Sequence, residues 1–288
     1  MIGMFDSGSG GLTILAGCRA LLPQQSFLYL GDHGRAPYGE KTPGQILDFT
    51  RTMVGELFAR GCGLVVLACN TASAIALREL QENWLPAHHP ERRLLGVLVP
   101  TVEALTGLPW DRDAPGLAEN CPASVGVFAT RRTVEAGTYG REIRRRAPTC
   151  AVIEQSCPGL VSAIEDGAIG RNAAQDELTA LVGGFTKTLL ARMKEETAGP
   201  PAVVLLGCTH YPMVEELFRA ALPAATKIVS QPGVVARALW AYLERHPHMA
   251  GGGKDETSLH LLTTGDPAAV IDPACFAPGG LPAFEQLD

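Results

Sequence analysis

The chain has 288 residues, of which 46% are hydrophobic and 19% are charged, so it can bury a large core and is too apolar to be disordered. Its net charge of −6 argues against a dedicated nucleic-acid binder, which normally presents a basic face. The start of the chain does not follow the pattern of a signal peptide, and no apolar run approaches the ~20 residues of a membrane span. We therefore expect a cytoplasmic protein that binds neither membrane nor nucleic acid directly.

Short apolar runs alternate with helical patterns along the chain, which predicts repeated strand–helix units. We expect strands at 2–5, 27–30, 64–68, 94–99, 125–129, 152–154, 203–206, 227–229 and 259–262. We expect helices at 12–22, 43–60, 72–83, 130–146, 159–166, 172–196, 213–222 and 233–245. Repeated units of this kind form parallel sheets with helices on both faces, so the predicted fold class is α/β.

Two of the expected strands end at a cysteine that is followed by polar residues. The strand at 64–68 leads into Cys69, and the strand at 203–206 leads through a glycine into Cys208, with His210 two positions later. Ligands of open α/β sheets bind outside the carboxyl ends of the strands. We therefore expect both thiols to lie where chemistry takes place, in two similar halves of the chain.

Three kinds of site compete to explain the two thiols. A metal site would use Cys69, Cys208 and His210, but C-x-H is poor ligand spacing and no fourth ligand is evident, so we expect no metal. A Cys–His nucleophile needs one cysteine and leaves the other unexplained. A two-base site places one titratable group on each face of a substrate carbon, and this arrangement uses both thiols.

Polar residues at the strand-to-helix turns favour an anionic small-molecule substrate. Free N–H groups and the helix dipole at such turns bind carboxylates, and they raise the thiolate fraction of a nearby cysteine. The residues that the turns present are Ser7, Asn70, Thr71, Thr130, Thr133 and Thr209.

The first turn allows two interpretations. Its glycines do not form G-x-G-x-x-G, because Thr13 stands at the third position, so we do not expect a dinucleotide site. Either the turn is tight and needs residues without Cβ, or Asp6 and Ser7 face a cleft at the strand end. Position and residue type favour the second interpretation.

Four segments together resemble glutamate racemase, a family of the cofactor-independent aspartate/glutamate racemase superfamily. They are Phe5–Leu12, Gly31–Asp32 with Pro37–Gly39, Ala68–Ser73 and Leu206–Pro212. The two cysteine motifs stand in the family's order and at family-like spacing. Their flanking residues distinguish this family from aspartate and hydantoin racemases.

The resemblance implies two similar α/β domains, 1–97 with 211–288 and 98–210, with the active site in the cleft between them. It implies interconversion of L- and D-glutamate without a cofactor, which supplies D-glutamate for bacterial peptidoglycan. By family analogy Cys69 removes the α-proton of D-glutamate with help from Asp6, and Cys208 removes that of L-glutamate with help from His210. Glu165 matches a family residue near that histidine. The positions implied to bind substrate are Asp6, Ser7, Pro37, Tyr38, Gly39, Cys69, Asn70, Thr71, Thr130, Thr133, Cys208, Thr209 and His210.

Two other functions remain open at this point. The chain could be a racemase or isomerase of another acidic substrate such as aspartate, or a binding protein that inhibits DNA gyrase, as some family members are reported to do. Nothing in the sequence indicates the gyrase partner. The family commonly forms homodimers, so we expect a homodimer.

The sequence departs from the family pattern at three places. His33-Gly34 stands beside the substrate loop, where the family more often has Thr or Ser followed by Ala. Either His33 alters substrate affinity or pH dependence, or it is exposed to solvent, and we expect the second. Ser230-Gln231-Pro232 replaces the usual Asp-Pro-style turn, and 108–122 is an insertion or linker.

Overall fold

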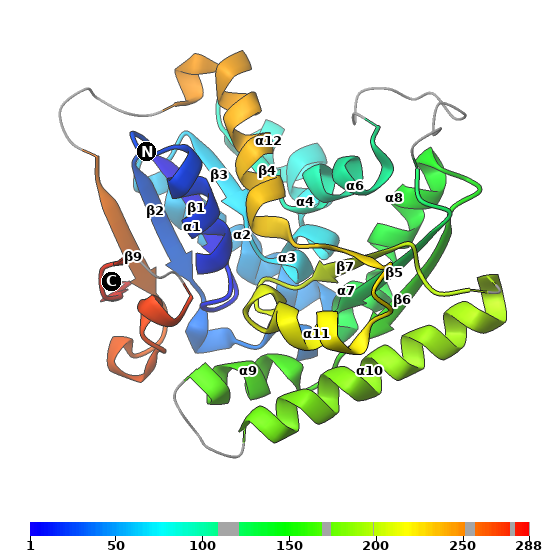
Figure 1. Cartoon of the computed structure of the whole chain (residues 1–288). Helices are drawn as coiled ribbons and strands as arrows, with labels where there is room; N and C mark the ends of the chain where they lie inside the picture. The colour runs from blue at the N-terminus through cyan, green and yellow to red at the C-terminus, as the bar shows by residue number, and fades with distance from the viewer. Residues whose placement is uncertain (109–120, 169–173, 198, 251–256, 277–279, 288) are drawn as a thin grey trace. The chain divides into compact units, whose positions relative to one another are not determined.

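A computed structural model describes residues 1–108, 121–168, 174–197, 199–250, 257–276 and 280–287 (Figure 1). The chain divides into two compact units. Unit 1 contains Met1–Val97 and Pro232–Asp288, and unit 2 contains Leu98–Gln231. Most of the expected insertion at 108–122 lies outside the described residues.

In the described part of unit 1, six parallel strands form a sheet in the order β10–β9–β2–β1–β3–β4. The strands are β1 (Ile2–Asp6), β2 (Phe27–Gly31), β3 (Leu64–Leu67), β4 (Arg93–Gly96), β9 (Leu259–Thr263) and β10 (Glu285–Gln286). The register pairs Asp6 with Gly31 and Phe5 with Leu67. The residues that follow β1, β2 and β3 therefore leave the sheet at the same edge.

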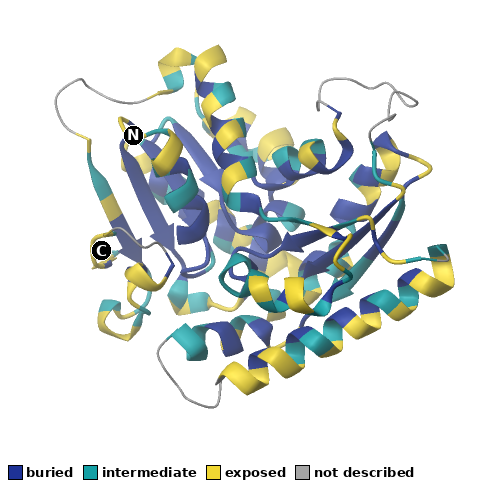
Figure 2. Cartoon of the chain, in the orientation of Figure 1, coloured by how far each residue is buried: buried dark blue, intermediate teal, exposed yellow. Residues whose placement is uncertain are grey.

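The main helices of unit 1 cover both faces of this sheet, which explains why its inner strands are apolar on both sides. Figure 1 shows α1 and α12 on one side and α2 on the other. On the α2 side, Phe5, Leu30 and Leu67 pack against Val54 and Leu57, and Figure 2 shows these strands buried. The helical segments are α1 (Leu12–Leu21), η1 (His33–Arg35), η2 (Tyr38–Glu40), α2 (Pro43–Ala59), α3 (Asn70–Ile75), α4 (Leu77–Glu79), η3 (Leu80–Trp84), α5 (Leu85–His88), α12 (Gln231–Arg245), η5 (Pro247–Met249), η6 (Pro267–Ala269) and η7 (Pro273–Cys275).

Unit 2 has a smaller sheet of the same kind. In its described residues four parallel strands lie in the order β6–β5–β7–β8, namely β5 (Ser124–Ala129), β6 (Ala151–Ser156), β7 (Val203–Gly207) and β8 (Lys227–Val229). Phe128, Val204 and Leu206 pack against Leu189 and Phe218 in one core. The helical segments are α6 (Leu98–Thr106), α7 (Arg131–Ala136), α8 (Thr138–Arg146), α9 (Leu160–Ala168), α10 (Ala174–Thr197), η4 (Tyr211–Val214) and α11 (Glu215–Ala221).

The α/β class and the two parallel sheets confirm the predicted fold class, and three local expectations need correction. The expected strand at 94–99 ends at Gly96, and Leu98 begins α6 instead. The expected helix at 130–146 is interrupted at Gly137, which has a left-handed backbone with φ of 59°. Residues 211–231, which we assigned to the first domain, fall in unit 2, because β8 pairs with β7.

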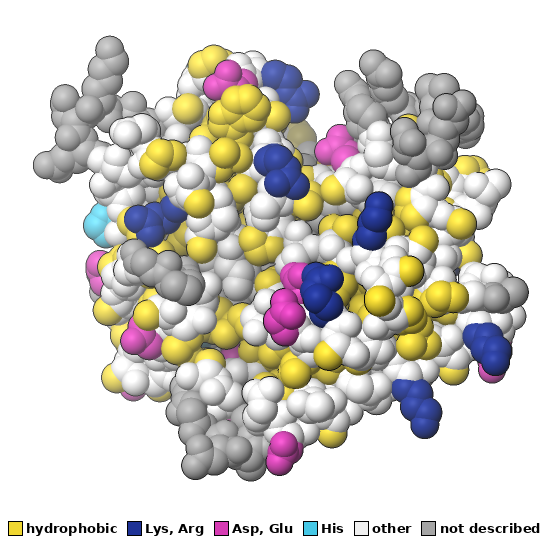
Figure 3. Space-filling view, in the orientation of Figure 1, with side chains coloured by type: hydrophobic (Ala, Val, Ile, Leu, Met, Phe, Trp, Pro, Cys, Tyr) yellow, Lys and Arg dark blue, Asp and Glu magenta, His cyan; other side chains and the backbone are white. Residues whose placement is uncertain are grey.

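The surface has an ordinary mixture of charges. Among the described residues no helix combines the length and the apolar composition needed to cross a bilayer. On the face shown in Figure 3, Lys and Arg side chains are scattered, some of them beside acidic side chains, and do not form a continuous basic stripe.

Candidate active site

Cys69 follows β3 and takes the N-cap position of α3. Its sulfur accepts a hydrogen bond from the Ala72 N–H at 3.4 Å, and its thiol donates to the Ser7 hydroxyl oxygen at 3.5 Å. Asn70 and Thr71 are buried in the first turn of the same helix. Because N–H groups at a helix N-terminus favour negative charge, this position suits a thiol that must take up and release a proton.

The turn after β1 holds Ser7 beside this thiol. The buried Asp6 carboxylate accepts a hydrogen bond from the Gly8 N–H at 3.0 Å, and the Tyr29 hydroxyl donates to the Gly8 carbonyl at 2.8 Å. A Cβ at Gly11 would lie 2.7 Å from the Asp6 Cβ and 2.9 Å from the Tyr29 hydroxyl oxygen. The turn therefore needs a residue without Cβ at Gly11, as the first interpretation expects, and it brings Ser7 to the cysteine.

A buried carboxylate anchors the loop after β2. Asp32 accepts hydrogen bonds from the Tyr38 hydroxyl at 2.6 Å, the Thr264 hydroxyl at 2.6 Å and the Arg35 Nε–H at 2.9 Å. Burial, reinforced by the charge of Asp32, raises the pKa of Tyr38 far above its ordinary value, so its hydroxyl stays a donor. Pro37–Gly39 is the predicted substrate segment. The Tyr38 hydroxyl in it holds the loop to Asp32, while Pro37 is exposed and Gly39 is partly exposed.

His33 is half-buried, so the expectation of a solvent-exposed histidine was wrong. Its Nε2 lies 2.8 Å from the Ser9 hydroxyl oxygen, and its Nδ1 lies 2.8 Å from the Thr263 hydroxyl oxygen. The ring also packs edge-on against Phe284, with centroids 5.1 Å apart. These partners come from distant parts of the sequence and join His33 to the turn after β1 and to the end of β9.

In unit 2, Cys208 follows β7 and has a histidine–carboxylate pair beside it. His210 Nδ1 lies 4.0 Å from the Cys208 sulfur, and its Nε2 lies 2.9 Å from Glu165 Oε1. Burial alone lowers the pKa of His210, but the hydrogen bonds and charges of Cys208 and Glu165 outweigh burial and raise the pKa to about 10. His210 is therefore an imidazolium at neutral pH, and its ring lies within hydrogen-bonding reach of the neighbouring sulfur.

Two threonines build the strand end next to Cys208. Thr130 caps α7 by accepting a hydrogen bond from the Thr133 N–H at 3.4 Å, and the two hydroxyl oxygens lie 2.9 Å apart. Because β5 and β7 are neighbours in the sheet, Thr130 and Cys208 leave it at the same edge. Thr209, the residue after Cys208, is also buried. The polar groups predicted for the second half of the chain thus follow two neighbouring strands at the same edge of the sheet.

Several other cysteines have a different character. Burial raises the pKa of Cys62 to about 11 and that of Cys18 to about 12, and it raises the pKa of Cys157 further. These side chains remain neutral thiols and serve as small core hydrophobes, as the sequence predicted. Cys157 also follows a strand, β6, so Cys69 and Cys208 are distinguished by their partners: the Ser7 hydroxyl and the Ala72 N–H at Cys69, and the His210 ring at Cys208.

The structure thus gathers predicted site residues in two clusters, one in each unit. Unit 1 assembles Asp6, Ser7 and Cys69 with the loop at 37–39, and unit 2 assembles Cys208, His210 and Glu165 with the threonines. In the described ranges, no group of three or more His, Cys, Asp or Glu side chains is arranged to hold a metal ion. Sequence reasoning assigned no role to several residues that secure the unit 1 cluster, which are Ser9, Tyr29, Asp32, Thr263 and Thr264. The family-like segments Phe5–Leu12 and Gly31–Asp32, which contain Ser9 and Asp32, were signals that could have pointed to two of them.

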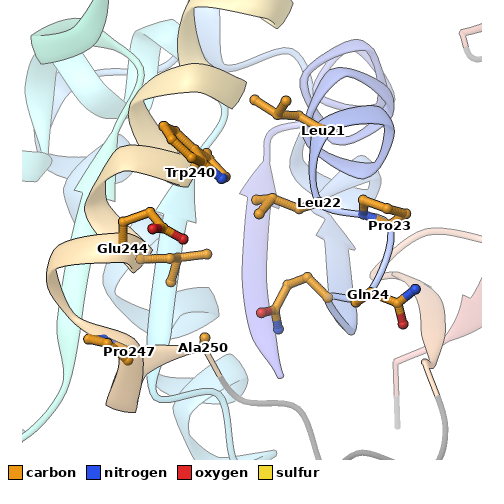
Figure 4. Close-up of a pocket in the computed structure, with 10 residues that line it drawn as sticks. Leu21, Leu22, Pro23, Gln24, Trp240, Glu244, Pro247 and Ala250 are labelled. Carbon is orange, nitrogen blue, oxygen red and sulfur yellow. The ribbon is translucent and has the colours of Figure 1, made fainter.

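A separate hollow of about 480 Å³ lies in unit 1 between the C-terminal end of α1 and α12 (Figure 4). Its lining includes Leu21 and Trp240, which are 43% and 47% exposed, together with Leu243 and Glu244. None of the predicted site residues belongs to the described residues that line it. The chemistry of the two thiols therefore lies elsewhere.

Comparison with known proteins gives consistent results at the level of sequence. The chain is 44% identical over 278 residues to a glutamate racemase of Roseobacter denitrificans, which covers 95% of this chain and 94% of that protein. It is 44% identical over 271 residues to a glutamate racemase of Paracoccus denitrificans, covering 93% of each chain. No protein-family model matches the chain.

Solved structures agree with these relatives. Glutamate racemase from Francisella tularensis in complex with D-glutamate superposes with a TM-score of 0.79 at 25% identity, covering 100% of this chain and 97% of that one. Glutamate racemase from Thermus thermophilus in complex with β-chloro-D-alanine superposes with a TM-score of 0.75 at 29% identity, covering 99% and 96%. Both neighbours share the fold across nearly their whole length.

Proposed function

The chain belongs to the glutamate racemase family, and we propose that it interconverts L- and D-glutamate with two cysteines as its acid and base. The observation that carries this proposal is that Cys69 and Cys208 each stand at the carboxyl end of a parallel strand, each beside polar groups suited to a thiolate. The complex of the Francisella tularensis relative with D-glutamate supports the choice of substrate.

Inversion of the α-carbon requires a proton to leave one face and another to arrive on the opposite face. Starting from D-glutamate, the Cys69 thiolate takes the α-proton, and the Cys208 thiol delivers its own proton to the other face. The products are L-glutamate, a Cys69 thiol and a Cys208 thiolate. Starting from L-glutamate the two roles reverse, so no proton is gained or lost overall.

The surroundings of Cys69 and those of Cys208 support a thiolate by different means. On one side, the Ala72 N–H stabilises charge on the Cys69 sulfur, and Asp6 assists the same thiol. On the other side, the His210 imidazolium stabilises Cys208, while Glu165 holds the imidazolium in place. The intermediate carbanion needs fixed donors on its carboxylate. We assign that role to Ser7, Asn70, Thr71, Thr130, Thr133, Thr209 and the segment Pro37–Gly39.

The first test follows the optical activity of L-glutamate by circular dichroism, with purified protein and no added pyridoxal phosphate. We expect the signal to decay to zero with glutamate and to persist with L-aspartate. Cys69→Ala and Cys208→Ala should each abolish racemisation, because each removes one of the two acids or bases. Turnover of aspartate alone, or full activity in either variant, would contradict the proposal.

A second test separates two bases from one. In D₂O, two thiols that act on opposite faces place solvent deuterium at the α-carbon of the newly formed enantiomer, while the unreacted enantiomer stays unlabelled at early times. A single base that served both faces would return the abstracted proton to some product molecules. NMR or mass spectrometry of the separated enantiomers distinguishes the two patterns.

We further propose that the enzyme is a cytoplasmic homodimer that supplies D-glutamate for peptidoglycan, as the family relationship implies. Light scattering coupled to gel filtration measures the assembly state, and a mass of a single chain would contradict the dimer. Growth of a D-glutamate-requiring bacterium on expression of the chain tests the biosynthetic role. Fractionation of cells that produce the protein tests its location.

A further inference from the structure

The His33 ring occupies a slot formed by backbone in unit 1. A Cβ added at Gly31 would lie 2.5 Å from the His33 Cε1, and one added at Gly265 would lie 3.0 Å from the His33 Cβ. Phe284 closes the slot with its ring edge-on. The ring therefore has little freedom to move, and its two nitrogens have fixed directions.

Both nitrogens of the ring have hydrogen-bond partners in other segments. Nδ1 lies 3.2 Å from the Gly31 carbonyl and 2.8 Å from the Thr263 hydroxyl oxygen. A carbonyl only accepts, and the same Thr263 oxygen accepts the Gly265 N–H at 3.0 Å, which favours a proton on Nδ1. Nε2 is then the acceptor for the Ser9 hydroxyl, at 2.8 Å. His33 thus links the end of β9 to the turn after β1.

That turn leads directly to the first thiol. Tyr29 and Asp6 hold the turn at Gly8, one residue before Ser9, and Ser7 on the other side of Gly8 accepts the hydrogen bond from Cys69. A shift of the turn at Ser9 therefore moves the partner of the Cys69 thiol. The hydrogen bond described for Cys208 is with His210, whose other nitrogen bonds to Glu165, and these three residues belong to unit 2.

We propose that His33 is a positioning residue for the Cys69 half of the reaction, acting through Ser9 and the turn that carries Ser7. This inference rests on the proposed racemase function. It predicts that changing His33 slows proton transfer at Cys69 and leaves proton transfer at Cys208 unaltered. Since each enantiomer loses its proton to a different thiol, isotope effects measured from the two enantiomers report on the two thiols separately.

The test compares wild type with His33→Phe, which keeps a ring in the slot but removes the hydrogen bonds of both ring nitrogens. We expect kcat/KM to fall about three- to tenfold, the kinetic equivalent of one lost hydrogen bond. With α-deuterated substrates, the isotope effect should rise from D-glutamate, because its cleavage by Cys69 becomes more rate-limiting, and should not rise from L-glutamate. His33→Asn retains one polar group and should recover part of the rate.

The controls separate this inference from loss of folding and from failure of the proposed function. If the variant is only destabilised, activity falls while the isotope effects from both enantiomers stay at their wild-type values. If His33 affects both thiols, the isotope effects from the two enantiomers change equally. Either result overturns the proposal. His260→Ala removes an exposed histidine from β9 of the same unit and should behave as wild type. If circular dichroism shows that His33→Phe is unfolded, the isotope effects of His33→Asn decide. A wild-type protein that does not racemise glutamate refutes the proposed function instead.

Discussion

Replacing Glu165 by glutamine removes the negative charge that holds His210, and it tests the histidine–carboxylate pair directly. The bond between His210 Nε2 and Glu165 Oε1 is 2.9 Å long. A hydrogen bond between charged groups contributes ~1.5–3 kcal/mol when it is shielded from water. Because the Glu165 side chain is 36% exposed, solvent screening reduces this to ~1 kcal/mol. We therefore expect kcat/KM to fall about fivefold.

The same substitution should change the pH dependence in a defined direction. His210 holds its proton up to a pKa of about 10 because Cys208 and Glu165 both stabilise the imidazolium. Glu165→Gln removes the charge of one of these two partners, so the pKa of His210 falls. As the pH is raised, the variant therefore loses activity at a lower pH than wild type does. A loss of ~1 kcal/mol corresponds to a shift of about 0.7 pH unit in the alkaline limb.

The assay is racemisation followed by circular dichroism between neutral pH and the alkaline limit of stability, for wild type and Glu165→Gln. Glu216→Gln serves as the matched control, because it makes the same charge change in unit 2 at a side chain that is 88% exposed. That control should keep the wild-type profile. An alkaline limb that does not move in Glu165→Gln would refute the assigned role of the carboxylate.

Three further changes test other parts of the site. Tyr38→Phe removes a 2.6 Å hydrogen bond to the fully buried Asp32 and should lower the free energy of unfolding, measured by urea denaturation, by ~2 kcal/mol. An unchanged denaturation midpoint would show that the loop does not depend on this hydrogen bond. Gly31→Ala places a Cβ 2.5 Å from the His33 ring and should reproduce the isotope effects of His33→Phe, whereas wild-type values would contradict the slot. His210 has a pKa near 6.5 when unfolded and about 10 when folded, so its proton stabilises the fold fully below pH 6.5 and this contribution disappears as pH rises toward 10. Denaturation at several pH values should show this decline in wild type and a weaker one in His210→Asn.

The features that local sequence determines were predictable. The apolar runs before Cys69 and Cys208 form buried parallel strands, and the thiols follow at the strand ends. The cap of α2 at Thr42 and that of α7 at Thr130 depend on residues three positions apart, so they too can be recognised in a short window.

The errors arose where distant residues decide the outcome. The run from Leu94 to Val99 is apolar throughout and therefore suits either a strand or a buried helix, and packing of α6 through Leu98, Val102 and Leu105 selects the helix. His33 looked like a loop residue because its partners Ser9 and Thr263 lie 24 and 230 positions away. No local pattern reveals such a contact.

The order in which the sheet strands occur along the chain has a consequence for synthesis on the ribosome. The four described strands of unit 2 lie between residues 124 and 229, so its sheet can form while the last strands of unit 1 are still unmade. In unit 1, β2 pairs with β9, and Thr263 and Thr264 at the end of β9 hold His33 and Asp32. A nascent chain that stops before β9 therefore keeps a complete unit 2 sheet but exposes β2 as an edge. Cys69 is synthesised before Cys208, yet its surroundings are complete only after the last strands of unit 1 have been made.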